Sequence, residues 1–87
     1  MKFANFITYI PDPEKVQSVR PLHRDYAQGL VGQGKIVIAG PFSDGAGAII
    51  VYEAESLEQA EALAANDAYA KGGCGRSMRF IPGTSSG

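Results

Sequence analysis

The sequence predicts a single α+β domain in which four strands and two helices follow one another in the order β-α-β-β-α-β. Three observations lead to this prediction. The chain has 87 residues, which suffice for one hydrophobic core and no more. Four short runs rich in β-branched and aromatic residues are typical of strands. Two longer stretches between them repeat apolar residues at the three- and four-residue spacing of a helix.

The first strand and the first helix carry the clearest patterns. The strand is expected over residues 2–10, because Pro11 and Pro13 follow and cannot continue a sheet ladder. The helix is expected over residues 14–33. Its apolar stripe comprises Val19, Leu22, Tyr26 and Leu30. An interior proline costs about 3 kcal/mol, so we expect Pro21 in the first turn of the main helix, after a separate short turn.

The remaining elements are shorter. Strands are expected over residues 35–39, 48–53 and 76–81, and residues 42–47 have the composition of a turn between paired strands. A second helix is expected from Ser56, a capping residue, to about Asn66. Its apolar stripe comprises Leu57, Ala60, Leu63 and Ala64. The order of elements is that of the ferredoxin-like fold, with the domain over residues 1–82 and a flexible tail over residues 83–87.

Both faces of the expected sheet are apolar, which indicates an oligomer. In the first strand Phe3, Ile7 and Tyr9 point one way while Phe6 and Ile10 point the other. In the third strand Ile50 and Tyr52 alternate in the same way with Ile49 and Val51. Two helices cover only one face of a four-stranded sheet, so we expect a second copy of the sheet to cover the other. The alternatives are another kind of partner or a large bound ligand.

Composition and charge exclude several classes of function. A net charge of −1 gives no basic field that would attract nucleic acid. The N-terminal residues lack the pattern of a secretory signal, and the longest apolar run, residues 48–52, is too short to span a membrane. We therefore expect a cytoplasmic protein. Cys74 is the only cysteine, so no internal disulfide is possible, and no cysteine and histidine cluster indicates a metal site.

His23 is the best-placed chemical group and the only histidine. Imidazole is the side chain that most readily exchanges a proton near neutral pH. Because we expect His23 in the first turn of the main helix, the helix dipole should favour the uncharged ring, which suits a general base. The alternative interpretation is a surface histidine or a core histidine whose hydrogen bonds are satisfied.

Asp67 and Tyr69, which both follow the second helix, are candidate partners of His23. Asp67 could orient an imidazole, as acidic residues do in catalytic triads, or could cap a short turn over residues 67–71. Tyr69 could line a pocket or merely pack.

Candidate substrate-binding residues lie elsewhere in the chain. Arg20, three residues before His23, could bind an anionic oxygen or could be a solvated residue of the helix start. Ser43 in the turn after the second strand could reach a ligand, although Ser43-Asp44-Gly45 is also an ordinary turn sequence. Arg76 and Arg79 are weaker candidates for binding an anion.

Four segments together resemble the YCII-related (YciI-like) family in order and spacing. They are Arg20-Pro21-Leu22-His23, residues 34–41, residues 55–60 and Asn66-Asp67-Ala68-Tyr69. The resemblance covers nearly the whole chain. It implies a ferredoxin-like fold whose sheets pair into a dimeric α+β barrel, and a site in which His23 and Asp67 form a dyad. Ala68 stands where the family has proline, which should loosen the turn that aims Asp67.

The resemblance also implies an activity. The best-defined reaction of the group is dehydrochlorination of a chlorinated hydroxyhydroquinone to a hydroxyquinone, and the short length of this chain is similar to that branch. His23 would then act as the base, Asp67 would hold its tautomer, and Arg20, Ser43 and Tyr69 would bind the aromatic substrate, with no cofactor. A non-catalytic dimeric module that binds a small aromatic metabolite is the second hypothesis. An isomerase or monooxygenase is a third, because these share the architecture.

Overall fold

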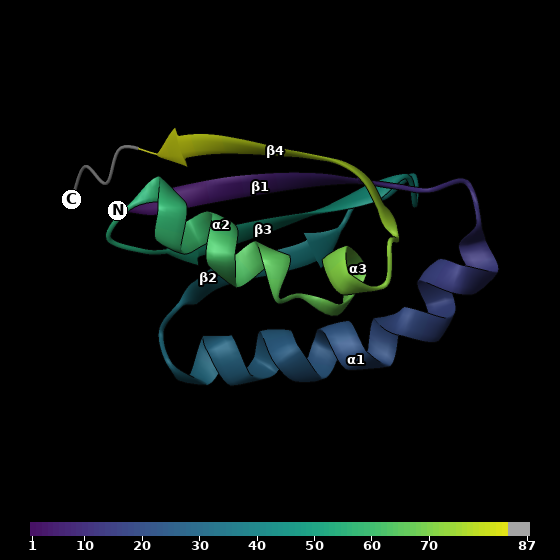
Figure 1. Ribbon diagram of the computed structural model, residues 1–87, viewed down its shortest axis with the longest axis horizontal. Helices are drawn as coiled ribbons and strands as arrows, with labels where there is room; N and C mark the ends of the chain where they lie inside the picture. Colours follow the sequence, from purple (N-terminus) through teal and green to yellow (C-terminus); the bar gives the residue numbers. More distant parts are fainter. Residues whose placement is uncertain (84–87) are drawn as a thin grey trace.

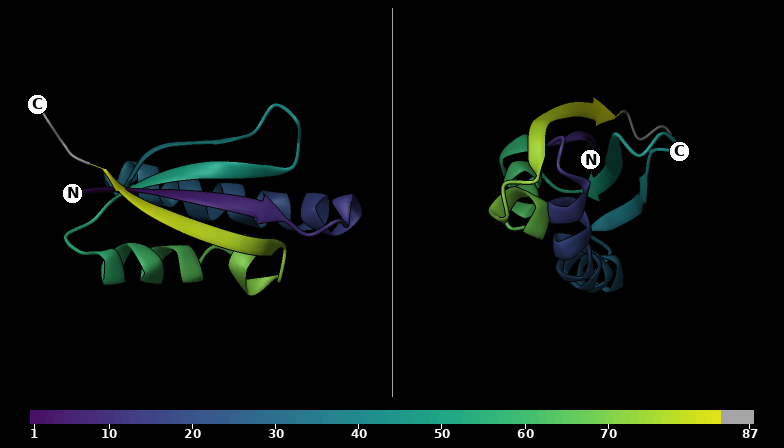
Figure 2. Two further views of the ribbon diagram at one scale, coloured as in Figure 1. Left: turned by 90° about the horizontal axis from the view of Figure 1, so that it is seen from above. Right: turned by 90° about the vertical axis from the view of Figure 1, so that its right-hand side faces the viewer.

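The computed structural model describes residues 1–83, without the side chains of residues 76–79, 82 and 83. It is an antiparallel four-stranded sheet with helices on one face (Figures 1 and 2). The strand order is β2-β3-β1-β4. The elements are β1 (Lys2–Tyr9), α1 (Pro13–Gly32), β2 (Ile36–Pro41), β3 (Gly47–Glu53), α2 (Leu57–Ala65), α3 (Ala68–Lys71) and β4 (Gly75–Gly83). The predicted α+β class and element order are confirmed, and the short α3 is added between α2 and β4.

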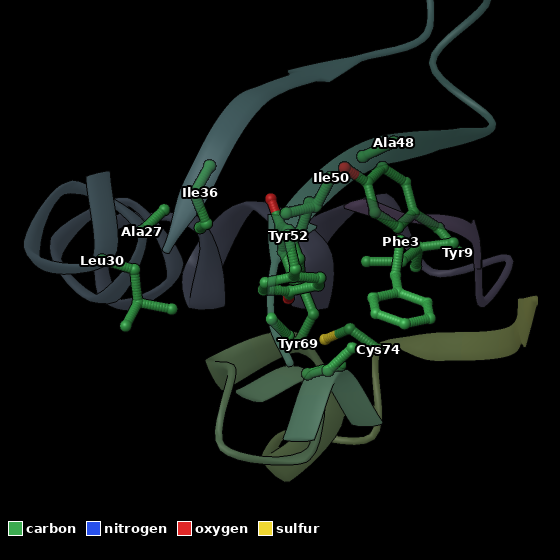
Figure 3. Close-up of a cluster of buried hydrophobic side chains, with 14 of the residues drawn as sticks. Phe3, Tyr9, Ala27, Leu30, Ile36, Ala48, Ile50, Tyr52, Tyr69 and Cys74 are labelled. Carbon is green, nitrogen blue, oxygen red and sulfur yellow. The ribbon is translucent and has the colours of Figure 1, made fainter. Parts of the chain in front are cut away.

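The core lies between the sheet and the helices. The inward residues of β1 and β3 are almost completely buried. Figure 3 shows apolar side chains of both strands, such as Phe3 and Ile50, gathered with those contributed by the helices, among them Leu30 of α1. The inward residues are Phe3, Asn5, Ile7 and Tyr9 of β1, and Ala48, Ile50 and Tyr52 of β3.

Helix α1 differs from the prediction because it runs without interruption through Pro21. The prediction of a separate turn before Pro21 is therefore wrong, and His23 lies in the interior of the helix rather than in its first turn. Asp12 caps the true start by accepting a hydrogen bond from the Lys15 amide. Figure 1 shows that the axis of α1 bends in its N-terminal part, as is expected of a helix that contains an interior proline.

The apolar stripe of α1 also differs from the predicted one. The Leu22 side chain is 63% exposed and belongs to the outer surface. The inward stripe comprises Val16, Val19, His23, Tyr26, Ala27 and Leu30, all buried or half-buried. On α2 the predicted stripe is confirmed at Ala60, Leu63 and Ala64, whereas Leu57 is exposed.

The second sheet face carries apolar side chains that no helix covers. Phe6 of β1 stacks on Phe42, with 6.3 Å between the ring centroids. Ile38 pairs with Val51 across β2 and β3, so both lie on this face, and Ile38 is 62% exposed. Ile10, which was predicted to share this face, lies beyond β1 and packs against the core instead. We refer to Phe6, Ile38, Phe42, Ile49 and Val51 as the open sheet face.

Gly47 begins β3 at a point where the chain passes very close to β1. A Cβ atom on this residue would overlap the backbone carbonyl oxygen of Ile7. Glycine is therefore required for Gly47 to pair with Thr8 in the observed register.

The end of the chain bears on two predictions. Gly83 still pairs with Lys2 in the sheet, and residues 84–87 of the predicted tail lie outside the described residues. No helix within residues 1–83 has the length and apolar character that crossing a membrane requires.

Candidate active site

Asp67 is positioned by the break between α2 and α3. Its backbone is extended, and its Oδ1 accepts a hydrogen bond from the Tyr69 amide at 2.9 Å, which makes it the N-cap of α3. The predicted capping role is thus present. The same carboxylate is 1% exposed and points toward α1. Ala68 in place of proline does not prevent this arrangement.

His23 and Asp67 form a close pair, although 44 residues separate them. Both carboxylate oxygens lie 2.8 Å from Nδ1 of the His23 ring. A carboxylate accepts hydrogen bonds and donates none, so Nδ1 is the nitrogen that carries the proton. Nε2 is then left as the acceptor in the neutral ring. The His23 side chain is 12% exposed, so it is sheltered but reachable.

The placement of His23 on α1 carries a signal that the sequence analysis missed. Val16, Val19 and His23 follow one another at intervals of three and four residues, and Leu30 lies seven residues further on. This spacing puts His23 on the inward face among apolar side chains. A polar ring at such a position needs a buried partner, and Asp67 is that partner.

Tyr69 and Arg20 complete the surroundings of the imidazole. The Tyr69 ring stacks on His23 with 4.2 Å between centroids and 22° between planes. Its hydroxyl accepts a hydrogen bond from Arg20 Nε at 3.4 Å. This bond raises the pKa of Arg20 above its usual value, so the guanidinium stays positively charged. Tyr69 therefore both packs and lines the site, and Arg20 lies one helical turn before His23.

Tyr9 of β1 is a further member of the site that the sequence analysis did not select. Its ring centroid lies 5.2 Å from that of Tyr69. Burial raises the pKa of Tyr9 most strongly. The neighbouring Tyr69 raises this pKa further, through its hydroxyl and through the charge it would carry when ionised, while Arg20 lowers it. Tyr9 thus remains a neutral hydrogen-bond donor. Its inward position on β1 gives the same signal as an ordinary core tyrosine, so sequence alone does not distinguish the two roles.

These side chains border a pocket of about 300 Å³ between α1 and the strands β2 and β3. Polar groups lie on the side of α1 and α3: Arg20, His23, Arg24, Gln28 and Tyr69. Apolar groups from the sheet, including Ala39, Pro41, Ala48 and Ile50, form the opposite side. An aromatic ring bound in this pocket would therefore contact flat or aliphatic groups on both sides. Oxygen atoms on that ring would contact positively charged side chains.

A layer of polar groups lies behind Asp67. The Tyr26 hydroxyl donates a hydrogen bond to the Leu63 carbonyl at 2.7 Å, which links α1 to α2. Tyr52 and Asn5 are fully buried beside each other, and burial together with the negative charge of Asp67 raises the pKa of Tyr52. Asn5 interrupts the apolar alternation of β1 between Phe3 and Ile7. That interruption is the signal by which sequence could have indicated a buried polar layer.

The remaining candidate with a described side chain, Ser43, lies apart from the dyad. Ser43 is exposed in the loop between β2 and β3 and is not among the residues that border the pocket. In that loop Asp44 accepts a hydrogen bond from the Ala46 amide, as an ordinary turn does. The side chains of Arg76 and Arg79 lie outside the described residues. The substrate-binding role of Ser43 stays a prediction.

Metal-binding groups do not gather at the site. Within the described part of the chain, no three His, Cys, Asp or Glu side chains lie close enough together to hold a metal ion. Cys74 is buried and free. The arrangement as a whole supplies a base, a positively charged group and phenolic donors, which are the parts required for proton transfer to and from an oxygen-bearing ring.

Comparison with known proteins agrees with this description. The family model described as the YCII-related domain matches residues 1–82. No curated protein matches the sequence significantly. Among solved structures, the chain is similar to 5-chloro-2-hydroxyhydroquinone dehydrochlorinase (TftG) from Burkholderia phenoliruptrix AC1100, in complex with 2,5-dihydroxybenzoquinone. The TM-score is 0.83 at 22% identity, over 99% of this chain and 96% of that chain. This likeness shows a shared fold.

Proposed function

Because this chain belongs to the YCII-related family, we propose that it is a small enzyme that uses His23 and Asp67 for acid–base chemistry on a hydroxylated aromatic substrate. One observation carries the proposal. A buried carboxylate holds Nδ1 of a sheltered imidazole, so that Nε2 is the nitrogen available to a pocket with positively charged and phenolic side chains. That is the arrangement by which an acidic residue orients a histidine base.

The reaction that we propose is dehydrochlorination of a chlorinated hydroxyhydroquinone. His23 Nε2 takes the proton of a ring hydroxyl and returns it to the ring carbon that carries chlorine, which gives a keto tautomer. Deprotonation of a second hydroxyl then expels chloride with the bonding electron pair. The ring loses one proton and one chloride ion and becomes a hydroxyquinone. Since chloride carries the electron pair away, the step needs no external oxidant.

The other groups of the site have roles in this scheme. Asp67 holds the ring tautomer and stabilises the imidazolium that forms when His23 accepts a proton. Arg20 stabilises the negative charge on the substrate oxygen. Tyr69 stacks on the imidazole and accepts from Arg20, so its own hydroxyl proton is free to bond a substrate oxygen. The similarity to the dehydrochlorinase fold supports this choice of substrate.

A dimer is part of the proposal. On the open sheet face Ile38 is exposed and Phe6 and Phe42 are half-buried, and a second copy of the sheet would bury them further. Removal of apolar surface from water contributes about 25 cal/mol per Å², so each 100 Å² contributes roughly 2.5 kcal/mol. An apolar face of this kind is typical of a homodimer interface.

The test is release of chloride. The purified protein is incubated without oxygen with 5-chloro-2-hydroxyhydroquinone and related chlorinated phenols, and free chloride is measured. We expect release by the wild type and a loss of about 100-fold or more in His23→Gln, within the range of general-base catalysis, while circular dichroism shows an unchanged fold. Tight binding of these phenols with no chloride release would contradict the enzyme proposal and favour a binding module.

A further inference from the structure

A second hollow of about 520 Å³ lies beside the His23 pocket. It is bordered by the end of β1, the loop that follows it, the first turns of α1 and the loop before β3. Two side chains, Tyr9 and Arg20, border both spaces. These are the same two groups that meet at Tyr69 beside the imidazole. The second hollow therefore adjoins the His23 pocket at Tyr9 and Arg20.

The chemistry of the two spaces differs. The first contains His23, Arg20 and Arg24, together with the amide of Gln28. Among the described side chains, the second is bordered by no charged group other than the shared Arg20, and its polar side chains are the uncharged Thr8 and Gln17. Most of its border is apolar and comes from Tyr9, Ile10, Pro11, Pro13, Val16 and Ala46. A space of this composition favours an apolar group over a charged one.

We propose that this second hollow is a subsite for an apolar substituent of the substrate. The inference rests on the proposed function, which puts a hydroxylated ring in the His23 pocket. A substituent on that ring passes Tyr9 and Arg20 and lies against Pro11, Val16 and Ala46. The substrate class then includes hydroxylated aromatics that carry an alkyl chain or a second ring, and these should bind more tightly than a single small ring. Tyr9 and Arg20 hold the substrate oxygens at the junction.

The size of the effect follows from the burial of apolar surface. Each buried methylene group contributes about 0.8 kcal/mol, which corresponds to roughly a fourfold gain in affinity. Four carbon atoms in the hollow would raise affinity up to about 200-fold if all were fully buried. Because the hollow is open to solvent at its outer side, we expect a gain of roughly 30-fold for a butyl group.

The test measures binding, so it does not depend on turnover. Hydroquinone and 2-butylhydroquinone are titrated by calorimetry, under reducing conditions, into the wild type, Ala46→Trp and the matched control Ala46→Ser. We expect 2-butylhydroquinone to bind about 30-fold more tightly than hydroquinone to the wild type and to Ala46→Ser. In Ala46→Trp, whose indole would fill the hollow, the two ligands should bind equally, and the affinity for hydroquinone should be unchanged.

Two outcomes would overturn the subsite. The first is equal affinity of both ligands for the wild type, which is also expected if a second copy of the chain fills the hollow. The second is a preference for the butyl compound that persists in Ala46→Trp. As a measurement independent of the variants, only 2-butylhydroquinone should shift the backbone amide resonances of Gly45 and Ala46, and equal shifts with hydroquinone would contradict the proposal. Chloride release remains a separate readout, so failure of the reaction and failure of the subsite are distinguishable.

Discussion

Asp67→Asn removes one negative charge from the side chain that holds His23 and leaves its shape almost unchanged. The carboxylate offers two acceptor oxygens 2.8 Å from Nδ1, and one of them also accepts from the Tyr69 amide. An asparagine side chain has a single acceptor oxygen, and its amide nitrogen would face the protonated Nδ1. The variant therefore tests orientation of the ring and stabilisation of the imidazolium with little change in packing.

The magnitude follows from the hydrogen bond that is lost. Hydrogen bonds to charged groups contribute about 1.5–3 kcal/mol. At about 1.4 kcal/mol for each factor of ten in rate, kcat/KM for chloride release should fall roughly 10- to 150-fold. Asparagine is about as good an N-cap as aspartate, so α3 should keep its cap, while the unpaired Nδ1 proton should lower the unfolding free energy by about 1–3 kcal/mol.

The assay compares Asp67→Asn with Asp25→Asn. Asp25 is an exposed carboxylate on α1, two residues after His23, so its variant removes the same charge from near the site without removing a contact to the ring. Chloride release and urea unfolding are measured for both. A rate for Asp67→Asn within twofold of the wild type, or equal to that of Asp25→Asn, would refute the role assigned to Asp67.

Three further predictions concern the fold and the assembly. Gly47→Ala should lower the unfolding free energy by about 2 kcal/mol or more, because its Cβ would overlap the Ile7 carbonyl. The control Gly40→Ala, with open space around the residue, should change the unfolding free energy by less than about 1 kcal/mol. Equal losses for the two variants in urea unfolding would contradict the close approach of Gly47 to β1. Burial raises the pKa of Tyr52, so above pH 10 the folded state keeps a proton that the unfolded state loses. The unfolding free energy should therefore fall with rising pH by about 1.4 kcal/mol per pH unit more in the wild type than in Tyr52→Phe. Parallel curves for the two proteins between pH 10 and 12 would show that this pKa is not raised. Ile38→Glu should convert the proposed dimer to a monomer in sedimentation equilibrium. Leu22→Glu is the matched control and should leave the dimer intact, because Leu22 is as exposed as Ile38, at 63% against 62%, but lies outside the open sheet face. A monomeric wild type or a dimeric Ile38→Glu would contradict the sheet-to-sheet interface.

The strands were predictable because their signals are local. Alternation grouped Phe3, Ile7 and Tyr9 on one face of β1 and separated Ile50 and Tyr52 from their neighbours in β3, and these residues form the buried face of the sheet. Proline and glycine marked the ends of the elements within a few residues. Beyond β1 the alternation no longer applies, and for that reason Ile10 was assigned to the wrong face.

The first helix was predicted less well because a local penalty competes with distant contacts. Pro21 costs the helix a hydrogen bond, and this penalty suggested a break. Val16, five residues earlier, is 3% exposed in the core, and Asp12 caps the start of the helix. The burial of the N-terminal turns offsets the local cost, and sequence alone does not show how deeply those turns pack.

Some members of the candidate site were predictable, whereas its geometry was not. His23 and Asp67 were selected from their chemistry and from the family resemblance, and their contact depends on how α1 and α3 pack. Tyr9 was missed because a strand tyrosine that faces inward has the pattern of a core residue. Asn5 was overlooked, although it interrupts the apolar alternation between Phe3 and Ile7; within the described residues its buried side chain makes no hydrogen bond.

The protonation state of the His23 ring is the sharpest test of the proposed pairing of His23 with Asp67. With one histidine in the chain, a long-range proton–nitrogen correlation spectrum of the ¹⁵N-labelled protein gives an unambiguous signal. We expect the neutral ring to carry its proton on Nδ1, which donates it to Asp67, and we expect the unprotonated Nε2 to change its resonance when hydroquinone binds. A neutral ring protonated on Nε2, or an Nε2 signal that does not respond to the ligand, would rule out His23 as the oriented base.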